Sequence, residues 1–231
     1  MLYVDIRKRL NSFDLAVKFE ADEAPLGIFG ASGSGKSMTL KCIAGIERPD
    51  SGVITLNGRT LFDSSRKIDL KPQERSVGYM FQDYALFPNM TVKGNIIAGL
   101  NRLNRADRNS RAEELMQAFR LSALSDKRPD RLSGGERQRA ALARLMAAEP
   151  ELMLLDEPFS SLDTVLKLSL IKDLKQTLER YGKGCLMVSH DVDELCAVCG
   201  KVTTITEGAN SPIVSSDDFA RDIHNRFNRG S

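Results

Sequence analysis

A glycine-rich segment constrains the fold of this 231-residue chain more than any other feature. Residues 30–37 read Gly-Ala-Ser-Gly-Ser-Gly-Lys-Ser, the G-x-x-x-x-G-K-S pattern of a phosphate-binding loop. The apolar run at 26–29 is typical of a buried strand, and residues 38–44 are typical of a helix. Because this pattern requires a strand before it and a helix after it, the sequence predicts an α/β core built around the loop.

The residue types of the loop suit a bound triphosphate. Glycines let the backbone wrap the phosphates closely, and the backbone N–H groups at a helix start attract anions. The Lys36 ammonium can reach the β- and γ-phosphates, and the Ser37 hydroxyl can ligate Mg²⁺. We therefore expect the nucleotide to contact Gly30, Ala31, Ser32, Gly33, Ser34, Gly35, Lys36, Ser37 and Met38.

Composition narrows the class of protein. The 33 basic and 31 acidic residues leave a net charge of +2, so no long-range field for nucleic acid is expected. No apolar run approaches the roughly 20 residues of a membrane span, and charges interrupt the N-terminus where a signal peptide would be apolar. Cys196 and Cys199 form a C-x-x-C without a second pair, so we interpret them as small residues on an apolar helix face. The sequence predicts a cytosolic protein.

Polar residues follow three further apolar runs that read as buried strands. Gln82 follows 76–81, Asp156 and Glu157 follow 152–155, and His190 follows 183–189. Parallel α/β sheets bind ligands at the carboxyl ends of their strands. Gln82 is placed to meet a metal or an attacking water, Asp156 to hold Mg²⁺ through water, and Glu157 to polarise the attacking water. His190 is either a surface loop residue or part of this site.

The middle third is helical. Residues 91–100 begin with a threonine cap, and 107–119 carry a clear amphipathic pattern. A third helix begins at Ser133-Gly134-Gly135, where a capping hydroxyl meets unhindered backbone N–H groups. This start is either an ordinary cap or a second anion site. The middle third therefore reads as a helical subdomain inserted into the core.

The N-terminal third reads as antiparallel strands. Residues 2–6 and 13–19 alternate apolar and polar, and Asn57-Gly58 predicts a hairpin turn. Either Phe13 or Tyr3 stacks on a nucleotide base or simply fills the core. The charged stretch 63–71 reads as an exposed loop. At the other end of the chain, residues 160–163 are expected to cap a long helix ending near 180, and a last helix is expected near 217–226.

In this order, the segments resemble the ATP-binding cassette family, the motor subunits of ABC transporters. Residues 30–37 match its Walker A, Gln82 its Q-loop glutamine, 132–136 its LSGGx signature, 152–157 its Walker B with the catalytic glutamate, 161–163 its D-loop and His190 its switch histidine. The resemblance implies an ATPase that pairs head to tail with a second cassette. Phosphates bound to Lys36 would meet Ser133, Gly134 and Gly135 of the other subunit. Glu157 would activate water, and His190 would sense the γ-phosphate. Ser37, Gln82 and Asp156 would bind Mg²⁺.

The resemblance also implies an architecture. We expect a P-loop NTPase core with a mixed, mainly parallel sheet and an antiparallel β subdomain in 1–88 and 148–231. The helical subdomain with the signature would occupy 89–147. Family members in the oxyanion group often carry a C-terminal regulatory domain, and a chain ending at 231 is expected to lack one.

Two segments suggest the type of transporter. Residues 82–92 resemble importer ATPases for oxyanions and sugars, and 57–63 look most like the molybdate, tungstate and sulfate group. This implies a homodimer at the cytoplasmic face of the membrane, permease subunits as partners, a substrate-binding protein as an indirect partner, and no nucleic acid. The alternative is a soluble ABC ATPase of DNA repair or translation. Repair members insert a long coiled coil before the signature, and translation members carry two cassettes in one chain.

Overall fold

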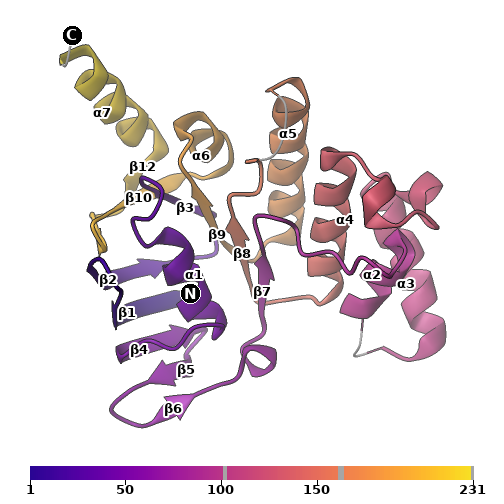
Figure 1. Ribbon diagram of the computed structural model, residues 1–231, viewed down its shortest axis with the longest axis horizontal. Helices are drawn as coiled ribbons and strands as arrows, with labels where there is room; N and C mark the ends of the chain where they lie inside the picture. Colours follow the sequence, from indigo (N-terminus) through magenta and orange to yellow (C-terminus); the bar gives the residue numbers. More distant parts are fainter. Residues whose placement is uncertain (101–102, 161–163, 230–231) are drawn as a thin grey trace.

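The computed structural model describes residues 1–100, 103–160 and 164–229. Its strands form one mixed sheet in the order β6-β5-β4-β1-β2-β11-β10-β3-β9-β8-β7, and β12 pairs with β10 (Figure 1). The strands are β1 (Leu2–Arg9), β2 (Asp14–Ala21), β3 (Leu26–Phe29), β4 (Ser51–Leu56), β5 (Arg59–Asp63), β6 (Ile68–Asp69), β7 (Val77–Met80), β8 (Leu152–Asp156), β9 (Gly184–Ser189), β10 (Lys201–Thr206), β11 (Ala209–Asn210) and β12 (Val214–Ser215).

The sheet has two halves of different character. From β10 through β3, β9 and β8 to β7 every neighbouring pair is parallel. From β6 through β5, β4 and β1 to β2 every pair is antiparallel. The expected fold class is therefore confirmed: a mixed sheet with a parallel core and an antiparallel extension.

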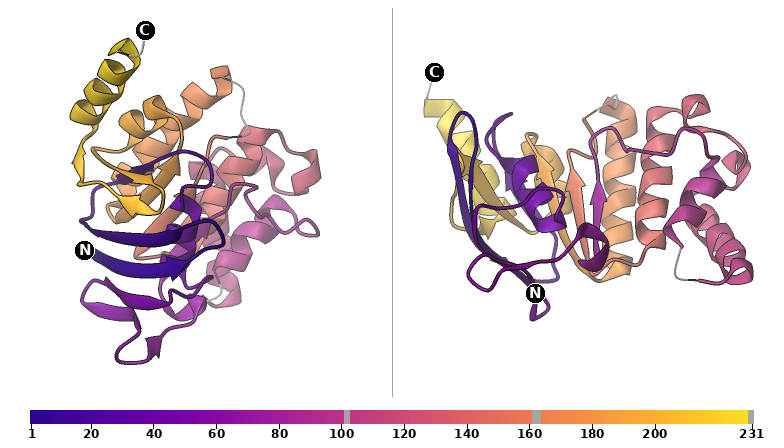
Figure 2. Two further views of the ribbon diagram at one scale, coloured as in Figure 1. Left: turned by 60° about the vertical axis from the view of Figure 1, so that its left-hand side comes forward. Right: turned by 60° about the horizontal axis from the view of Figure 1, so that its bottom comes forward.

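Seven α-helices accompany the sheet in the described part of the chain. They are α1 (Lys36–Ala44), α2 (Val92–Gly99), α3 (Arg105–Ala118), α4 (Gly134–Ala147), α5 (Thr164–Tyr181), α6 (Val192–Val198) and α7 (Ser216–Arg229). In Figures 1 and 2, α1 lies between the antiparallel strands and the parallel ones, while α2 and α3 stand at the far side of α4. No described helix has the length and apolar character needed to cross a membrane.

Strand β8 shows how the core divides. Its residues alternate between the two faces of the sheet, as the two-residue period of a strand requires. Leu152 and Leu154 pack into the cluster that holds α1 and the antiparallel strands, whereas Met153 and Leu155 pack into the cluster built from the other helices. Both faces are covered, which explains a continuous apolar run in place of an alternating one.

Several local predictions are confirmed. Asn57 and Gly58 have φ values of 50° and 78° in the turn between β4 and β5, as a tight hairpin needs. Thr91 caps α2, because its side chain accepts the Gly94 N–H. The long helix after 163 is α5, although residues 161–163 themselves lie outside the described residues.

The interpretation of 63–71 as an exposed loop holds for the turn at 64–67 and is wrong on either side of it. Asp63 is buried at the end of β5, and Ile68–Asp69 form the short strand β6. Asp63 accepts the N–H groups of Ser65 and Arg66, so its charge is satisfied locally and can be buried. The sequence pattern missed this because charge density was taken as a sign of exposure.

One helix start is also two residues earlier than expected. Helix α3 begins at Arg105, since the Asn104 side chain accepts the Asp107 N–H and acts as the cap. The last helix is longer at both ends than the expected 217–226.

Candidate nucleotide-binding site

The phosphate-binding loop lies between β3 and α1, as its sequence predicts. Gly33 and Gly35 have φ values of 79° and 108°, which side chains rarely adopt. A Cβ on Gly35 would lie 2.7 Å from the Cδ1 of Leu15, and one on Gly30 would overlap the backbone oxygen of Ile205. Glycine is therefore required both by the backbone angles and by close packing.

Lys36 is buried within this loop. Its Nζ donates to the backbone oxygens of Gly30 and Ala31, both at 2.8 Å. Burial lowers the pKa of this ammonium, and the nearby charges of Glu157 and Asp156 partly oppose that shift. The ammonium therefore points into the concave side of the loop, with two neutral carbonyls as its partners.

Ser34 adds a second polar group to the loop. Its Oγ is buried and has no hydrogen-bond partner among the described residues. A buried hydroxyl without a partner costs free energy, so it suits a loop that receives a polar ligand. Ala31, Ser32 and Gly33 form the exposed tip, and Met38 is half-buried in the first turn of α1.

Asp156 connects the loop to the end of β8. The Ser37 Oγ donates to Asp156 Oδ1 at 2.7 Å, and the Tyr79 hydroxyl donates to Asp156 Oδ2 at 2.7 Å. Burial, together with the hydrogen bond to Asp156, raises the pKa of Tyr79. A hydroxyl and a carboxylate side by side are hard oxygen donors of the kind that Mg²⁺ prefers. The residues present therefore fit the metal expected from the sequence.

Glu157 lies where three strands end. Gln82 Nε2, after β7, donates to Glu157 Oε2 at 3.2 Å, and His190 Nδ1, after β9, lies 3.4 Å from Glu157 Oε1. The Glu157 backbone has a φ of 46° and donates its N–H to the oxygen of Val188 at 3.0 Å. This left-handed turn directs the carboxylate across the strand ends, and such strained conformations cluster at functional sites.

A partly buried network supports the backbone around His190. The Ser189 Oγ donates to Glu194 Oε2 at 2.6 Å, and Lys167 Nζ lies 2.7 Å from Glu194 Oε1 and 3.1 Å from Asp191 Oδ2. Asp191 caps α6 through the N–H groups of Asp193 and Glu194. Burial raises the pKa of Asp191, but its hydrogen bonds to Lys167 and to the Glu194 N–H outweigh this, so the net shift is downward.

The segment 133–135 lies apart from this cluster. Ser133 is exposed at the start of α4, its Oγ accepts the Glu136 N–H at 3.4 Å, and its own N–H donates to the Glu136 carboxylate at 2.7 Å. This is a capping box, and its N–H donor lowers the pKa of Glu136. The hydrogen bonds given for Ser133 stay within its own helix start, so the structure does not bring it to the phosphate loop of the same chain.

The two aromatic candidates are placed differently. The Phe13 ring edge lies 3.4 Å from the position of a Cβ on Gly35, which puts it beside the phosphate loop. Tyr3 instead hydrogen-bonds Asp5 and stands opposite Glu20 and Thr55 in the sheet. Only Phe13 of the two adjoins the loop.

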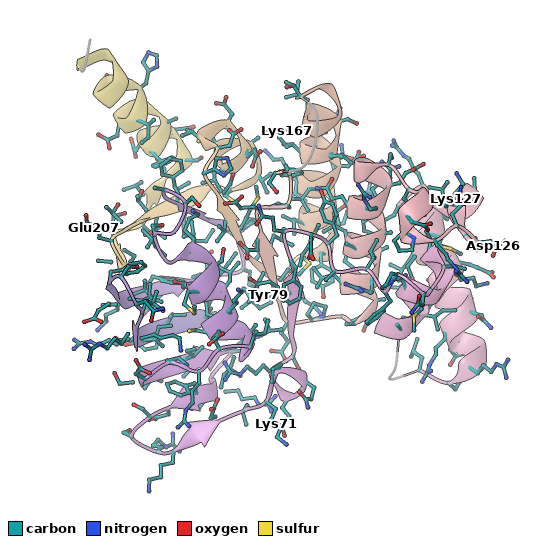
Figure 3. All side chains as sticks on the ribbon, viewed as in Figure 1. Lys71, Tyr79, Asp126, Lys127, Lys167 and Glu207 are labelled. Atoms are coloured by element: carbon teal, nitrogen blue, oxygen red, sulfur yellow. The ribbon has the colours of Figure 1, made fainter. Side chains whose placement is uncertain are left out.

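Sequence reasoning missed Tyr79 and Lys167, which Figure 3 labels on β7 and α5. Tyr79 lies on the strand that leads to Gln82, three residues before it, so its position was a usable signal. Lys167 gave none, because its partners on α6 are distant in sequence. For Cys196 and Cys199, the described residues contain no group of three or more His, Cys, Asp or Glu side chains able to hold a metal. The Cys196 thiol instead donates to the backbone oxygen of Ser216.

Comparison with known proteins identifies the family. The family model described as "ABC transporter" matches residues 13–160, which include the phosphate loop, Gln82, the signature segment and Glu157. The chain belongs to this family, as the resemblance of its motifs predicted.

Relatives agree with the assignment, and a solved structure shares the fold. The chain is 36% identical to "Molybdenum import ATP-binding protein ModC" of Paramagnetospirillum magneticum, over 100% of this chain and 65% of the relative. It is 39% identical to "Molybdate/tungstate import ATP-binding protein WtpC" of Archaeoglobus fulgidus, over 90% of this chain and 84% of the relative. The chain thus spans slightly less than two thirds of the ModC relative. A dimeric ATP-binding cassette in a post-hydrolysis state with ADP and Pi has the same fold, with TM-score 0.78 at 24% identity over 94% of this chain and 99% of that one.

Proposed function

We propose that this chain hydrolyses ATP in a site completed by a second copy, as the motor subunit of an importer for an oxyanion such as molybdate or tungstate. The observation that carries the ATPase proposal is the meeting of Lys36, Ser37, Asp156, Glu157 and His190 at one edge of the parallel sheet. Each of these groups matches a need of phosphoryl transfer: charge neutralisation, metal binding and orientation of water.

The phosphates would lie in the loop 30–37. Lys36 would exchange its two carbonyl partners for phosphate oxygens, which are better acceptors because they are charged. Ser34 would gain the partner that its hydroxyl lacks. The Phe13 ring, beside Gly35, is suited to stack on adenine. Ser37, Asp156 and Gln82 would hold Mg²⁺, which would neutralise charge between the β- and γ-phosphates.

Glu157 would hold the attacking water. Its Oε1 and Oε2 are already placed by His190 and Gln82, so the carboxylate is oriented before substrate binds. A general base is effective when it reaches the proton of a positioned water. After transfer, His190 would lie against the departing γ-phosphate, and its hydrogen bonding would then differ between ATP and ADP.

A second copy would supply the other half of the site. Ser133, Gly134 and Gly135 open α4 with backbone N–H groups suited to an anion, and they do not meet the chain's own phosphate loop. A two-fold pair would place each such helix start over the partner's loop. The relative with the same fold is itself described as dimeric, which supports this arrangement.

The loop after Gln82 would transmit the conformational difference between the ATP-bound and ADP-bound states to a membrane partner. Arg144 of α4 donates to the backbone oxygens of Tyr84 and Ala85 and lies 5.0 Å over the Phe87 ring. Phe87 itself and the following Met90 are exposed apolar residues. We assign 1–88 and 148–231 to the nucleotide-binding core and 89–147 to the helical part that faces a permease. With such a partner, the chain would act at the cytoplasmic face of the membrane.

The experiment that tests this function is a purification of the tagged chain from detergent-solubilised membranes, followed by an ATPase assay and mass spectrometry. We expect a permease with membrane spans to co-purify, and ATP turnover to respond to its substrate-binding protein loaded with molybdate or tungstate. Co-purification of soluble partners alone, such as ribosomes or repair proteins, would contradict the importer role. Absence of Mg²⁺-dependent turnover would contradict the ATPase itself.

A further inference from the structure

Tyr79 makes a contact that the proposed mechanism does not use. Its hydroxyl donates to Asp156 Oδ2 at 2.7 Å, while Ser37 Oγ donates to Asp156 Oδ1 at 2.7 Å. Each oxygen of one carboxylate therefore has its own donor, from a different element. Asp156 itself is buried at the end of β8.

The position of the Tyr79 ring is fixed by its surroundings. Tyr79 lies opposite Leu154 in the parallel pairing of β7 with β8, so its side chain lies beside the strand that ends in Asp156. Its ring packs on Phe81 with centroids 4.5 Å apart. A ring held by these contacts presents its hydroxyl to Asp156 in one geometry, and Figure 3 labels Tyr79 on β7.

A fixed hydroxyl matters because a carboxylate rotates easily. The terminal torsion of an aspartate is broad and roughly two-fold, so a single contact at Oδ1 would leave the plane of the group loosely defined. The Tyr79 hydrogen bond at Oδ2 restricts this rotation and keeps Oδ1 directed at Ser37. Partners of this kind outside the ligands themselves change metal affinity by about 10-fold to 100-fold in other proteins.

We propose that Tyr79 is a positioning residue for the divalent cation, acting through Asp156 on the side that faces Ser37. The inference rests on the proposed nucleotide function, because the cation is expected to bind together with a nucleotide. Tyr79 on β7 would thus support the metal site without binding the cation itself.

The test compares Tyr79→Phe with Tyr84→Phe. Both remove one buried or half-buried hydroxyl and keep the ring, but the Tyr84 hydroxyl donates to the Pro158 oxygen and not to Asp156. Mn²⁺ would be titrated into each variant with ADP, and bound metal measured by electron paramagnetic resonance. ADP affinity in EDTA would be measured in parallel.

We expect Tyr79→Phe to weaken Mn²⁺ binding by about 10-fold and to leave ADP affinity in EDTA unchanged. Tyr84→Phe should match the wild-type chain in both measurements. Equal Mn²⁺ affinity in the wild type and Tyr79→Phe would overturn the role of Tyr79 alone, and so would an equal loss in both variants. A wild-type chain that binds no Mn²⁺ with ADP would overturn the proposed function as well.

Discussion

Two regions differ in whether one chain alone brings their functional groups together. They are the strand-end cluster (Gln82, Asp156, Glu157 and His190) and the start of α4 (Ser133, Gly134 and Gly135). At the strand ends, Asp156 and Glu157 each hold contacts to two other elements. At the start of α4, the hydrogen bonds of Ser133 within the described residues go to Glu136 and Arg137 of its own helix. Both segments are proposed to act on the same bound nucleotide, yet only the first has its groups brought together by the fold.

This difference shows where the chain depends on a partner. The strand-end groups are positioned by sheet register and by burial, so they are ready before nucleotide arrives. The α4 start is held by its own capping box, and Ser133 is exposed there, as an element of an interface with a second copy would require. The comparison leads to our central claim that one active site is built from two chains, and the following variants test each half in turn.

The largest effect is expected at the strand ends. Glu157→Gln removes the base but keeps the shape and the contacts of the side chain, so turnover should fall by about 1,000-fold while ATP binding persists. A closed ATP-bound dimer should then accumulate and appear by size-exclusion with Mg-ATP. The control Glu113→Gln, on exposed α3, should have no effect. Near-normal turnover by Glu157→Gln would remove the base that we assign.

A smaller loss is expected at the start of α4. Ser133→Arg places a long charged side chain where the partner's phosphate loop would approach, so turnover should fall by about 100-fold, a loss that converts to roughly 2.7 kcal/mol. ATP binding by the isolated subunit should be unchanged, because Ser133 does not contact its own loop. Ser122→Arg, another exposed position, serves as the control. Normal ATP-dependent dimerisation of Ser133→Arg would show that this helix start does not lie in the interface.

The smallest effect concerns the support of the strand-end cluster. Lys167→Met leaves the buried Glu194 carboxylate and Asp191 without their cation, so the free energy of unfolding should fall by about 1 kcal/mol near neutral pH. Asp191 has a lowered pKa and Lys167 a raised one. The stability from Asp191 is present above its unfolded pKa of about 3.9 and is lost as the pH falls through its folded value.

The contribution of Lys167 behaves oppositely. It is complete below the unfolded pKa of about 10.5 and is lost as the pH rises through the folded value. The deficit of Lys167→Met should therefore be largest between about pH 5 and 10 and should shrink on both sides. Urea unfolding across this pH range measures it, with Lys172→Met as an exposed control on the same helix. A deficit that stays constant with pH would mean that packing of the Lys167 stem, and not its charge, supports α6.

The sequence predicted which polar residues follow the buried strands, because the patterns that indicate them are local. A glycine pattern defines the loop, and an apolar run ending in Asp156-Glu157 defines both a strand and its polar end. The carboxyl ends of parallel strands must then meet at one edge. The convergence of Gln82, Glu157 and His190 follows from topology without any knowledge of side-chain contacts.

The contacts that sequence reasoning missed depend on tertiary packing. Arg75 is fully buried and donates to the backbone oxygens of Cys42 and Ile43 at the end of α1, and it also pairs with Asp69. Nothing in the charged run around it distinguishes it from its exposed neighbours. Tyr79 was likewise interpreted only as part of an apolar strand. Such polar contacts arise when separate elements pack together, and sequence periodicity does not record them.

The most direct test of the two-chain site is a mixing experiment with two inactive variants. Lys36→Ala disables the phosphate loop, and Ser133→Arg disables the α4 start. A mixed dimer would contain one site with both halves intact and one with both halves damaged. We predict that ATP turnover, near zero for each variant alone, rises on mixing and peaks at equal amounts. Turnover that stays at the sum of the separate variants at every ratio would contradict a site shared between two chains.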